Sequence, residues 1–308
     1  MSVVNEARKK KNGNESGGMI RSEATRVGDW IIAVICFIIM FVCLLPMLNV
    51  LARSLSSAEY LIRNEVVLWP KGWNVDAYTT VLSDAKYVHS LWYTALLTVG
   101  CTLLSLSMTV MCAYPLIYKE LKGGKAINVI ILFTMYFSAG MIPHYLWLRN
   151  LGMLDTVWVL VIPSCLSVYN MIIMRSFFYG VPDSLREAAE IDGAGPIRTL
   201  VMIYLPLSKA VLATLALFYA VGRWNGFSDA LLYLKKREDL YPIQLLLYNI
   251  LQNATNVEVA TQEGFSTPGL GETLKMATVM FATVPILLIY PWLQRYFVTG
   301  VTLGAVKG

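Results

Sequence analysis

Residues 187–206 read EAAEIDGAGPIRTLVMIYLP, a stretch with a polar start that lies between two long apolar runs of the 308-residue chain. An apolar chain does not need such an insert in order to cross a bilayer. The insert therefore predicts a surface beside the membrane where a soluble partner docks. The rest of the sequence indicates which side of the membrane that surface faces.

The composition is typical of a membrane protein. Hydrophobic residues make up 56% of the chain and charged residues only 15%, whereas a soluble domain usually has about 25% charged residues. Six apolar stretches approach or exceed the ~20 residues that a helix needs to cross a bilayer: Ile31–Val50, Leu91–Ile117, Ile127–Trp147, Val157–Met174, Val211–Leu234 and Leu274–Phe297. Backbone polar groups within lipid must be satisfied inside the segment. We therefore predict an all-α, polytopic membrane protein with six transmembrane helices.

The distribution of basic residues predicts the orientation. With six spans, both termini lie on one side of the membrane. If that side is the cytoplasm, fifteen of the 25 Lys and Arg residues lie inside, nine lie outside, and Arg223 lies within a span. Cytoplasmic loops carry an excess of Lys and Arg. The net charge of +5 is therefore a sign of topology rather than of nucleic-acid binding.

The polar stretch has the signals of a short helix, a tight turn and a second short helix. Ser184 and Glu187 have the spacing of a capping box. Gly193 stands where a helix ends in a left-handed residue, and Pro196 suits the first turn of a new helix. Pro206 ends the segment before the next apolar run. On spacing alone, Glu187 either caps its own helix within a solvated loop or contacts a partner.

The same residues resemble the EAA signature of permease subunits in binding-protein-dependent ABC importers. In that signature EAA is followed by DGA and then by a spaced I-x-LP, between the fourth and fifth spans. The matching residues here are Glu187, Ala188 and Ala189, then Asp192, Gly193 and Ala194, and finally Ile203, Leu205 and Pro206.

Further similarities point to carbohydrate-type permeases. Residues 68–72 (LWPKG) and 76–78 (DAY) resemble the external segment that follows the first helix in that group. Trp224-Asn225, residues 241–244 (YPIQ) and residues 300–308 (GVTLGAVKG) resemble its LplC/YtcP-like branch. The similarity extends over nearly the whole chain from about residue 27.

The resemblance implies that the loop is a coupling helix that sits in a cleft of an ATPase subunit. Glu187 would meet a basic residue there, Ala188 and Ala189 would allow close approach, and Gly193 would make the turn. In maltose-type relatives the C-terminal tail also touches the ATPase, which suggests the same for Gly300–Gly308. The implied partners are two ATPase subunits, a second permease that forms a heterodimer with this chain, and an extracytoplasmic sugar-binding protein. No cofactor is expected in this chain, because ATP and Mg would be bound by the ATPase subunits.

The expected function is transport without chemistry of its own. The chain has no GxxxxGK[ST] phosphate loop and is not expected to be an enzyme. It would move a sugar or oligosaccharide across the bacterial cytoplasmic membrane by alternating access, driven by the partner ATPases. Two alternatives stay open: an ABC permease for a non-sugar solute, and an ion-coupled secondary transporter, which would need carboxylates at mid-membrane.

Arg223 lies within the fifth predicted span, together with Trp224 and Asn225. An intramembrane charge is a functional hypothesis by default, so these three residues are candidates for the translocation path. The alternative is an arginine that snorkels to the external interface beside an interfacial tryptophan.

The predicted domain organisation is simple. Residues 1–26 are expected to form a disordered cytoplasmic tail, because they are polar and contain few apolar residues. Residues 27–299 form the transmembrane domain, with the coupling loop at about 182–206. Residues 300–308 form a cytoplasmic C-terminal tail.

Overall fold

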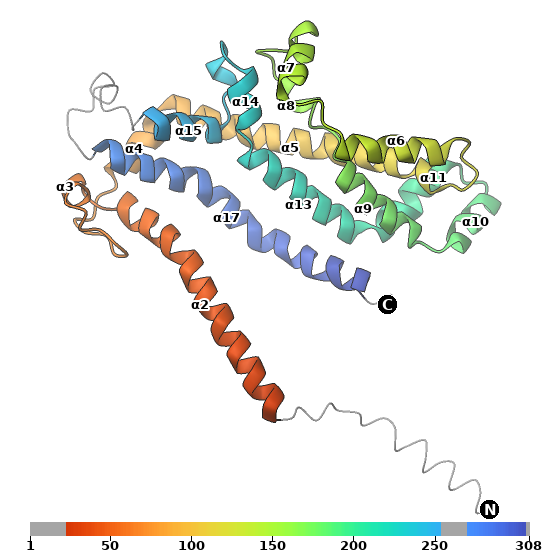
Figure 1. The fold of residues 1–308 in the computed structure, drawn as a ribbon, viewed down its shortest axis with the longest axis horizontal. Coiled ribbons are helices and arrows are strands. Elements are labelled where there is room, and N and C mark those ends of the chain that lie inside the picture. Colours follow the sequence, from red (N-terminus) through yellow and green to blue (C-terminus); the bar gives the residue numbers. More distant parts are fainter. Residues whose placement is uncertain (1–22, 254–269, 306–308) are drawn as a thin grey trace, which may run out of the picture. The chain divides into compact units, whose positions relative to one another are not determined.

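The computed structural model describes residues 23–253 and 270–305 (Figure 1). The chain divides into two compact units, Met1–Val50 and Leu51–Gly308. The first contains most of helix α2 (Glu23–Ser54). The second contains the other described elements and both candidate sites.

The described part of the second unit is helical apart from its turns and loops and one isolated bridge between Ser56 and Trp73. Its elements in chain order are α3 (Ala58–Ile62), α4 (Asp76–Ser83), α5 (Ala85–Ala113), the 3-10 helix η1 (Pro115–Ile117), α6 (Gly124–Tyr136), α7 (Met141–Asn150), α8 (Trp158–Val161), α9 (Val168–Tyr179), α10 (Asp183–Ile191), α11 (Pro196–Thr199), the π-helix η2 (Leu200–Tyr204), α12 (Leu205–Leu207), α13 (Lys209–Asn225), α14 (Ser228–Tyr233), the 3-10 helix η3 (Glu238–Leu240), α15 (Ile243–Asn253) and α17 (Leu270–Ala305).

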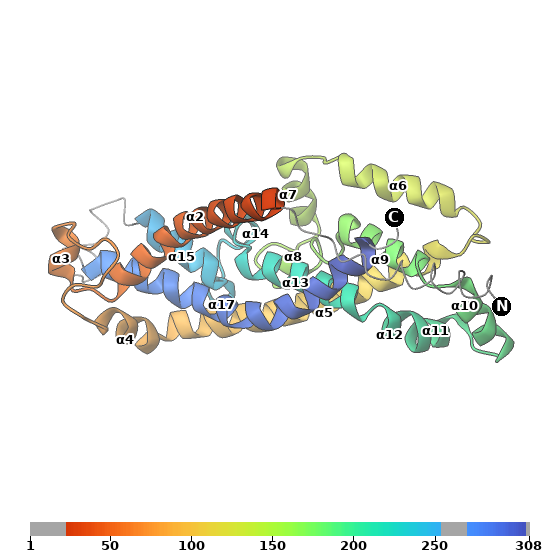
Figure 2. The same ribbon diagram turned by 90° about the horizontal axis from the view of Figure 1, so that it is seen from below.

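Helix α5 is the element around which the second unit is organised. It packs against α13 and α9, and α13 packs in turn against α17. Figures 1 and 2 show α10 and α11 beyond one end of α5, and α3 and α4 beyond the other end. The polar loop is therefore carried at one end of the bundle.

Two apolar clusters hold α5 in place. The cluster near its C-terminal end includes Tyr114, Met174, Tyr204 and Leu215, which join α5, α9, η2 and α13. The other cluster contains Leu97 and joins α5 to α7, α8, α14 and α15. Between helices that span a membrane, such clusters stabilise through close van der Waals packing rather than through removal of apolar surface from water. The first cluster therefore fixes the base of the polar loop.

The prediction of helices is confirmed, but the count of six spans is not. Among the described residues, three helical segments are long and apolar enough to cross a membrane: Gly28–Ser54, Ala85–Ile117 and Gly271–Ile289. The number rises to five if each of two bent helix pairs is one span. The bent pairs are α6 with α7, at 112°, and α11–α12 with α13, at 84°.

Three predicted spans are broken where the sequence has residues that disfavour a helix. Val157–Met174 is divided into α8 and α9 by a turn that contains Pro163, and Ser167 caps the start of α9 by accepting the Asn170 N–H at 3.3 Å. Ile127–Trp147 bends before α7 at Gly140, whose φ of +89° suits glycine. Val211–Leu234 breaks at Gly226, after α13. Apolar composition alone does not reveal such breaks, because the residues between them remain apolar.

The ends of the chain differ from the predicted boundaries. Helix α2 begins at Glu23, within the segment expected to be a tail, and α17 continues through Ala305, past the predicted boundary at 299. The predictions for residues 1–22 and 306–308 lie outside the described residues.

Candidate functional site

The polar loop begins with α10, and its start differs from the prediction. The helix begins at Asp183, its N-cap is Pro182, and no side chain caps it. Ser184 is therefore already inside the helix, and the predicted capping box with Glu187 is wrong. Asp183 in the first turn still places a carboxylate near the positive end of the helix dipole.

The end of α10 is a Schellman turn. Gly193 has a φ of +76°, as the sequence predicts. The Gly193 N–H donates to the Glu190 carbonyl at 3.0 Å, and the Ala194 N–H donates to the Ala189 carbonyl at 2.8 Å. These two bonds satisfy carbonyls that the helix end would otherwise leave unpaired. The EAA helix and the segment after it are therefore joined through a defined turn.

The segment after the turn is helical up to a sharp bend. Pro196 is the first residue of α11, as predicted. Pro206 has no N–H to donate to the carbonyl four residues earlier. The π-helix η2 ends two residues before it, and the Leu205 N–H donates to the Leu200 carbonyl. The chain then turns by 84° at Ser208 into α13. The break therefore falls two residues after Pro206.

An aromatic cluster supports the loop from inside. The Tyr114 hydroxyl donates to the Pro196 carbonyl at 3.0 Å and is 2.5 Å from the Tyr118 hydroxyl. The Tyr114 ring meets those of Phe178 and Tyr204 edge to face, a favoured arrangement for aromatic pairs. The Arg186 guanidinium of α10 lies 5.3 Å from the centre of the Tyr118 ring. Both halves of the loop thus contact the end of α5.

The predicted docking residues divide into an exposed set and an internal set. Glu187, Ala188, Asp192 and Gly193 are exposed, and Ala189 and Ala194 are half-buried. Ile203 and Leu205 pack against the core, whereas Pro206 is exposed. Two large apolar side chains that were not predicted, Ile191 and Ile197, are 86% and 79% exposed on the same loop.

A groove of about 590 Å³ lies at the base of α10. Glu187 and Arg186 line it together with Asp183 and Lys119, whose charged groups are 3.8 Å apart. Arg186 also pairs with Glu190 at 3.3 Å, one turn along the helix. Glu187 makes no ion pair within the described residues, so its carboxylate is available to a partner.

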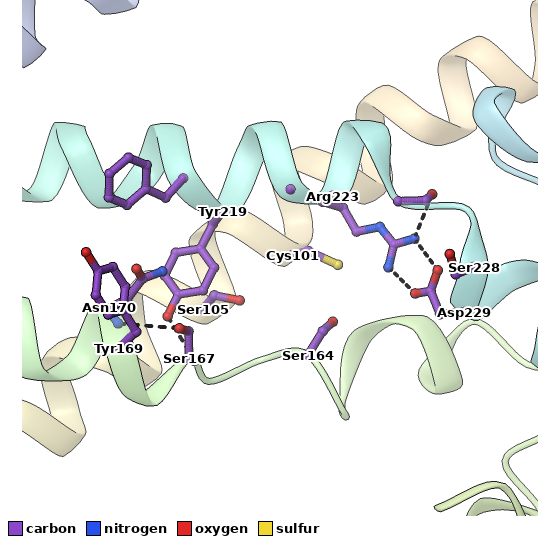
Figure 3. Close-up of a pocket in the computed structure, with 13 residues that line it drawn as sticks. Cys101, Ser105, Ser164, Ser167, Tyr169, Asn170, Tyr219, Arg223, Ser228 and Asp229 are labelled. Atoms are coloured by element: carbon purple, nitrogen blue, oxygen red, sulfur yellow. Dashed lines mark hydrogen bonds and ion pairs between the residues drawn. The ribbon is translucent and has the colours of Figure 1, made fainter. Parts of the chain in front are cut away.

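A second hollow lies between α5, α9, α13 and the α8–α9 connection, with a volume of about 730 Å³ (Figure 3). This is within the ~300–1,000 Å³ of typical ligand pockets. Its polar lining side chains are Ser105, Ser164, Ser167, Tyr169, Asn170, Tyr219, Arg223, Ser228 and Asp229. Most of them are neutral hydroxyl or amide groups.

Arg223 lies at one end of this cavity in a fixed ion pair. Its Nη1 and Nη2 atoms donate to the two carboxylate oxygens of Asp229 at 2.6 and 3.1 Å. They also donate to the carbonyls of Leu160 at 3.2 Å and Gly226 at 3.4 Å. The Arg223 side chain is only 7% exposed, so the guanidinium is held inside the protein and does not snorkel to an interface.

The other two predicted path residues do not line the cavity. Trp224 is buried, and its indole N–H donates to the Ala282 carbonyl of α17 at 3.1 Å. Asn225 is exposed, and its amide donates to the Val221 carbonyl one turn earlier at 3.0 Å. The structure therefore places only Arg223 of the three at the cavity.

Several lining residues were not predicted. Asp229 lies after the end of α13, so no helical spacing connects it with Arg223. Ser105 and Asn170 lie on two different helices, and only the packing of α5 on α9 brings both to the cavity. In the sequence these lining residues are recognisable only as polar residues within apolar runs. Such residues are common in helices that are buried in protein, so the pattern does not single them out.

The loop between α7 and α8 and the loop between α14 and η3 are joined at Asp155. This residue has a φ of +56°, and one of its carboxylate oxygens accepts the backbone N–H groups of Lys236 at 2.8 Å and Lys235 at 2.6 Å. The hydrogen bond from the Lys236 N–H, and to a smaller extent that from the Lys235 N–H, lowers the pKa of the Asp155 carboxyl below its usual value.

Comparison with known families and relatives agrees with the geometry. The family model described as "binding-protein-dependent transport system inner membrane component" matches residues 85–303. Among curated relatives, a Bacillus subtilis polygalacturonan/rhamnogalacturonan transport system permease protein, YtcP, is 38% identical over 88% of this chain and 96% of its own length. Protein LplC of the same organism is 39% identical over 87% of this chain and 90% of its own length.

A solved structure has the same fold. A chain of a bacterial ABC transporter involved in the import of the acidic polysaccharide alginate superposes with a TM-score of 0.83 at 32% identity. The match covers 90% of this chain and 98% of that chain.

Proposed function

The chain belongs to the family of inner membrane components of binding-protein-dependent transport systems, and on that premise we propose that it carries a sugar or oligosaccharide inward, driven by partner ATPases. YtcP and the alginate importer, whose names refer to polysaccharides, support the substrate class. The chain acts as one permease subunit and hydrolyses no ATP itself.

The proposed coupling to the ATPase rests on one observation. Helix α10 ends in the Schellman turn at Gly193 and presents an exposed face of small residues. Ala188 adds almost no bulk, so a partner can approach the helix backbone closely. Glu187 is exposed at the edge of this face and can pair with a basic group. The exposed Ile191 and Ile197 add apolar area of the kind that protein interfaces bury.

The internal residues of the EAA signature have a different role. Ile203 and Leu205 pack against the cluster that holds Tyr204 and Leu215. We assign them to the connection between the docking surface and α13, rather than to the surface itself. A movement of α10 would then reach α13, which lines the 730 Å³ cavity.

The assembly and orientation follow from the same proposal. The docking surface faces the cytoplasm, where the ATPases bind ATP and Mg. The chain pairs with a second permease, and an extracytoplasmic binding protein delivers the sugar to the opposite side. Both termini lie in the cytoplasm.

Co-purification tests the proposal. Tagged chain is recovered from native membranes as wild type, Glu187→Ala and Gly193→Pro, with Gly195→Ala as the matched control. Proline cannot adopt the positive φ of Gly193 and removes its N–H, so Gly193→Pro should lose the ATPase. Gly195 has a φ of −72° and open space beside it, so its alanine variant should retain the ATPase.

The Glu187→Ala sample separates docking from a purely local role. Loss of the ATPase with a normally inserted chain assigns Glu187 to the interface. If wild type brings down no ATPase while other membrane complexes survive the extraction, the importer proposal fails. An ion-coupled transporter would then be the better account. Retention of the ATPase together with ATP-dependent uptake of a non-sugar solute would instead favour a different ABC substrate class.

A further inference from the structure

The charge on the wall of the 730 Å³ cavity is already neutralised within the protein. Arg223 and Asp229 are the charged residues among those that line it in the described part of the chain. Four of the five N–H groups of Arg223 donate to Asp229, Leu160 and Gly226. The fifth, on Nε, is buried and has no hydrogen-bond partner among the described residues. A carboxylate that entered the cavity would have to displace Asp229 in order to reach the guanidinium.

The carboxylate is the more accessible member of this pair. The Asp229 side chain is 30% exposed, against 7% for Arg223. Its Oδ1 accepts both Arg223 Nη2 and the Ala230 N–H, while Oδ2 accepts Arg223 Nη1 alone. A carboxylate offers about four lone-pair positions, so Oδ2 retains one for a ligand that donates a hydrogen bond. A second anion would instead be repelled.

Two of the neutral polar side chains that line the cavity, those of Ser105 and Asn170, lack partners within the described part of the protein. The side chains of Ser105 and Asn170 are 3% and 5% exposed, and neither makes a side-chain hydrogen bond to another described residue. Ser228 lies beside Asp229 (Figure 3) and is exposed. The Ser105 hydroxyl and the Asn170 amide line a space that a polar ligand can fill, and a ligand there can supply the hydrogen bonds that the protein does not.

We propose that this cavity is a subsite for an uncharged, hydroxyl-bearing sugar ring, with Asp229 as hydroxyl acceptor and Arg223 as the residue that positions it. Asn170, Ser105 and Ser228 supply further hydrogen bonds to hydroxyl groups. The inference rests on the proposed sugar transport and adds that this cavity binds uncharged sugar rings. If the transported sugar also contains uronate residues, their carboxylates are recognised elsewhere in the assembly.

The test uses the intact importer in proteoliposomes and two probes that differ only at C6 of each ring. Galactobiose and digalacturonate with the same linkage differ in having a hydroxymethyl group or a carboxylate at C6. Uptake is measured for wild type and Asp229→Asn. The control is Asp239→Asn, because Asp239 forms a similar two-point pair with Arg237 outside the cavity, at 2.8 and 2.7 Å.

The expected result is a change in KM that is specific to one variant. Hydrogen bonds to charged groups contribute about 1.5–3 kcal/mol, so Asp229→Asn should raise the KM for galactobiose by about tenfold or more. Uptake at saturating galactobiose should change little, and Asp239→Asn should behave like wild type. Arg223→Lys keeps the charge but loses the two-point geometry, and it should raise the same KM to a smaller extent.

Two results would overturn the inference. One is a wild-type preference for digalacturonate that disappears in Arg223→Gln, which would make the guanidinium an anion receptor. The other is a lack of uptake of either probe by an importer that retains its ATPase. In the second case the importer proposal still holds, because the ATPase is retained, and only the sugar subsite is refuted. If wild type itself brings down no ATPase, the importer proposal fails.

Discussion

The N–H of Ala194 donates to the carbonyl of Ala189 at 2.8 Å, across the turn that ends the EAA helix. This bond closes only because Gly193, between the two residues, has a left-handed conformation. The turn therefore fixes the exposed face of α10 relative to the start of α11, in addition to the contacts that both make with Tyr114 and Tyr118.

Replacing Gly193 with alanine should weaken binding of the ATPase without preventing membrane insertion. A Cβ atom in the left-handed region costs about 1–2 kcal/mol, which corresponds to roughly a 5- to 30-fold smaller equilibrium constant for forming the native turn. We expect a loss of ATPase affinity of that size, measured by titrating purified ATPase onto the chain in nanodiscs. Gly193→Asn should lose less, because asparagine tolerates this conformation. Equal affinities for all three chains would show that the turn does not govern docking.

The Tyr114 hydroxyl should control how firmly α11 is held. Tyr114→Phe keeps the edge-to-face contacts with Phe178 and Tyr204 but removes the bonds of the hydroxyl to the Pro196 carbonyl and the Tyr118 hydroxyl. A hydrogen bond of this kind contributes about 1 kcal/mol, so hydrogen exchange in the 196–207 segment should become about fivefold faster. Tyr136→Phe is the control, since Tyr136 is 84% exposed. Unchanged exchange in Tyr114→Phe would place the restraint in the aromatic rings alone.

The local features of the loop were predictable because they depend on one residue each. Gly193 at a helix end and Pro196 at a helix start have conformational preferences that do not need tertiary packing. The capping box failed because it requires the helix to begin at one particular residue. The chain begins α10 at Asp183 instead, and Ser184 then lies within the first turn.

The cavity was less predictable because its residues meet through packing. Arg223 could be singled out as a charge in an apolar run, but its partner Asp229 lies beyond a helix break. The carbonyl that also accepts from it belongs to Leu160, 63 residues earlier. Trp224 was a reasonable candidate from composition, yet the rotation of α13 turns it towards α17 instead. Spacing along one helix cannot show which neighbour each face will meet.

Trp224 should contribute to stability rather than to transport specificity. Its indole N–H donates to Ala282, and its ring is 7% exposed. Trp224→Phe removes that bond and part of the ring, at a cost of about 1–2 kcal/mol. The thermal midpoint of the purified chain in detergent should fall, while the KM for transported sugar stays the same. Trp158→Phe, at a residue that is 62% exposed, should leave the midpoint almost unchanged.

Asp155 should protect the 235–237 segment, whose sequence Lys-Lys-Arg is a target for trypsin. Its carboxylate holds the N–H groups of Lys235 and Lys236. Asp155→Ala removes both bonds and leaves a Cβ residue at a φ of +56°, so tryptic cleavage there should become severalfold faster. Asp155→Asn retains an oxygen acceptor and tolerates the conformation, and it should be cleaved at an intermediate rate. Identical rates for the three chains would show that other contacts hold this loop.

The same contact should make the loop sensitive to acid. The pKa of Asp155 is lowered in the folded chain, chiefly by the N–H of Lys236, whereas an unfolded aspartate titrates near about 3.9. A group with a depressed folded pKa stabilises the fold above its unfolded pKa, and this contribution is lost as the pH falls through the folded value. Cleavage by pepsin between Leu234 and Tyr241 should therefore rise as the pH falls from about 4 towards about 2. Asp155→Asn has no carboxylate at this position, so the acid-dependent rise should be smaller than in wild type; the part that remains is expected from Asp239, whose carboxyl pKa is lowered by Arg237. If the variant shows the same additional rise as wild type, the acid sensitivity comes from another group.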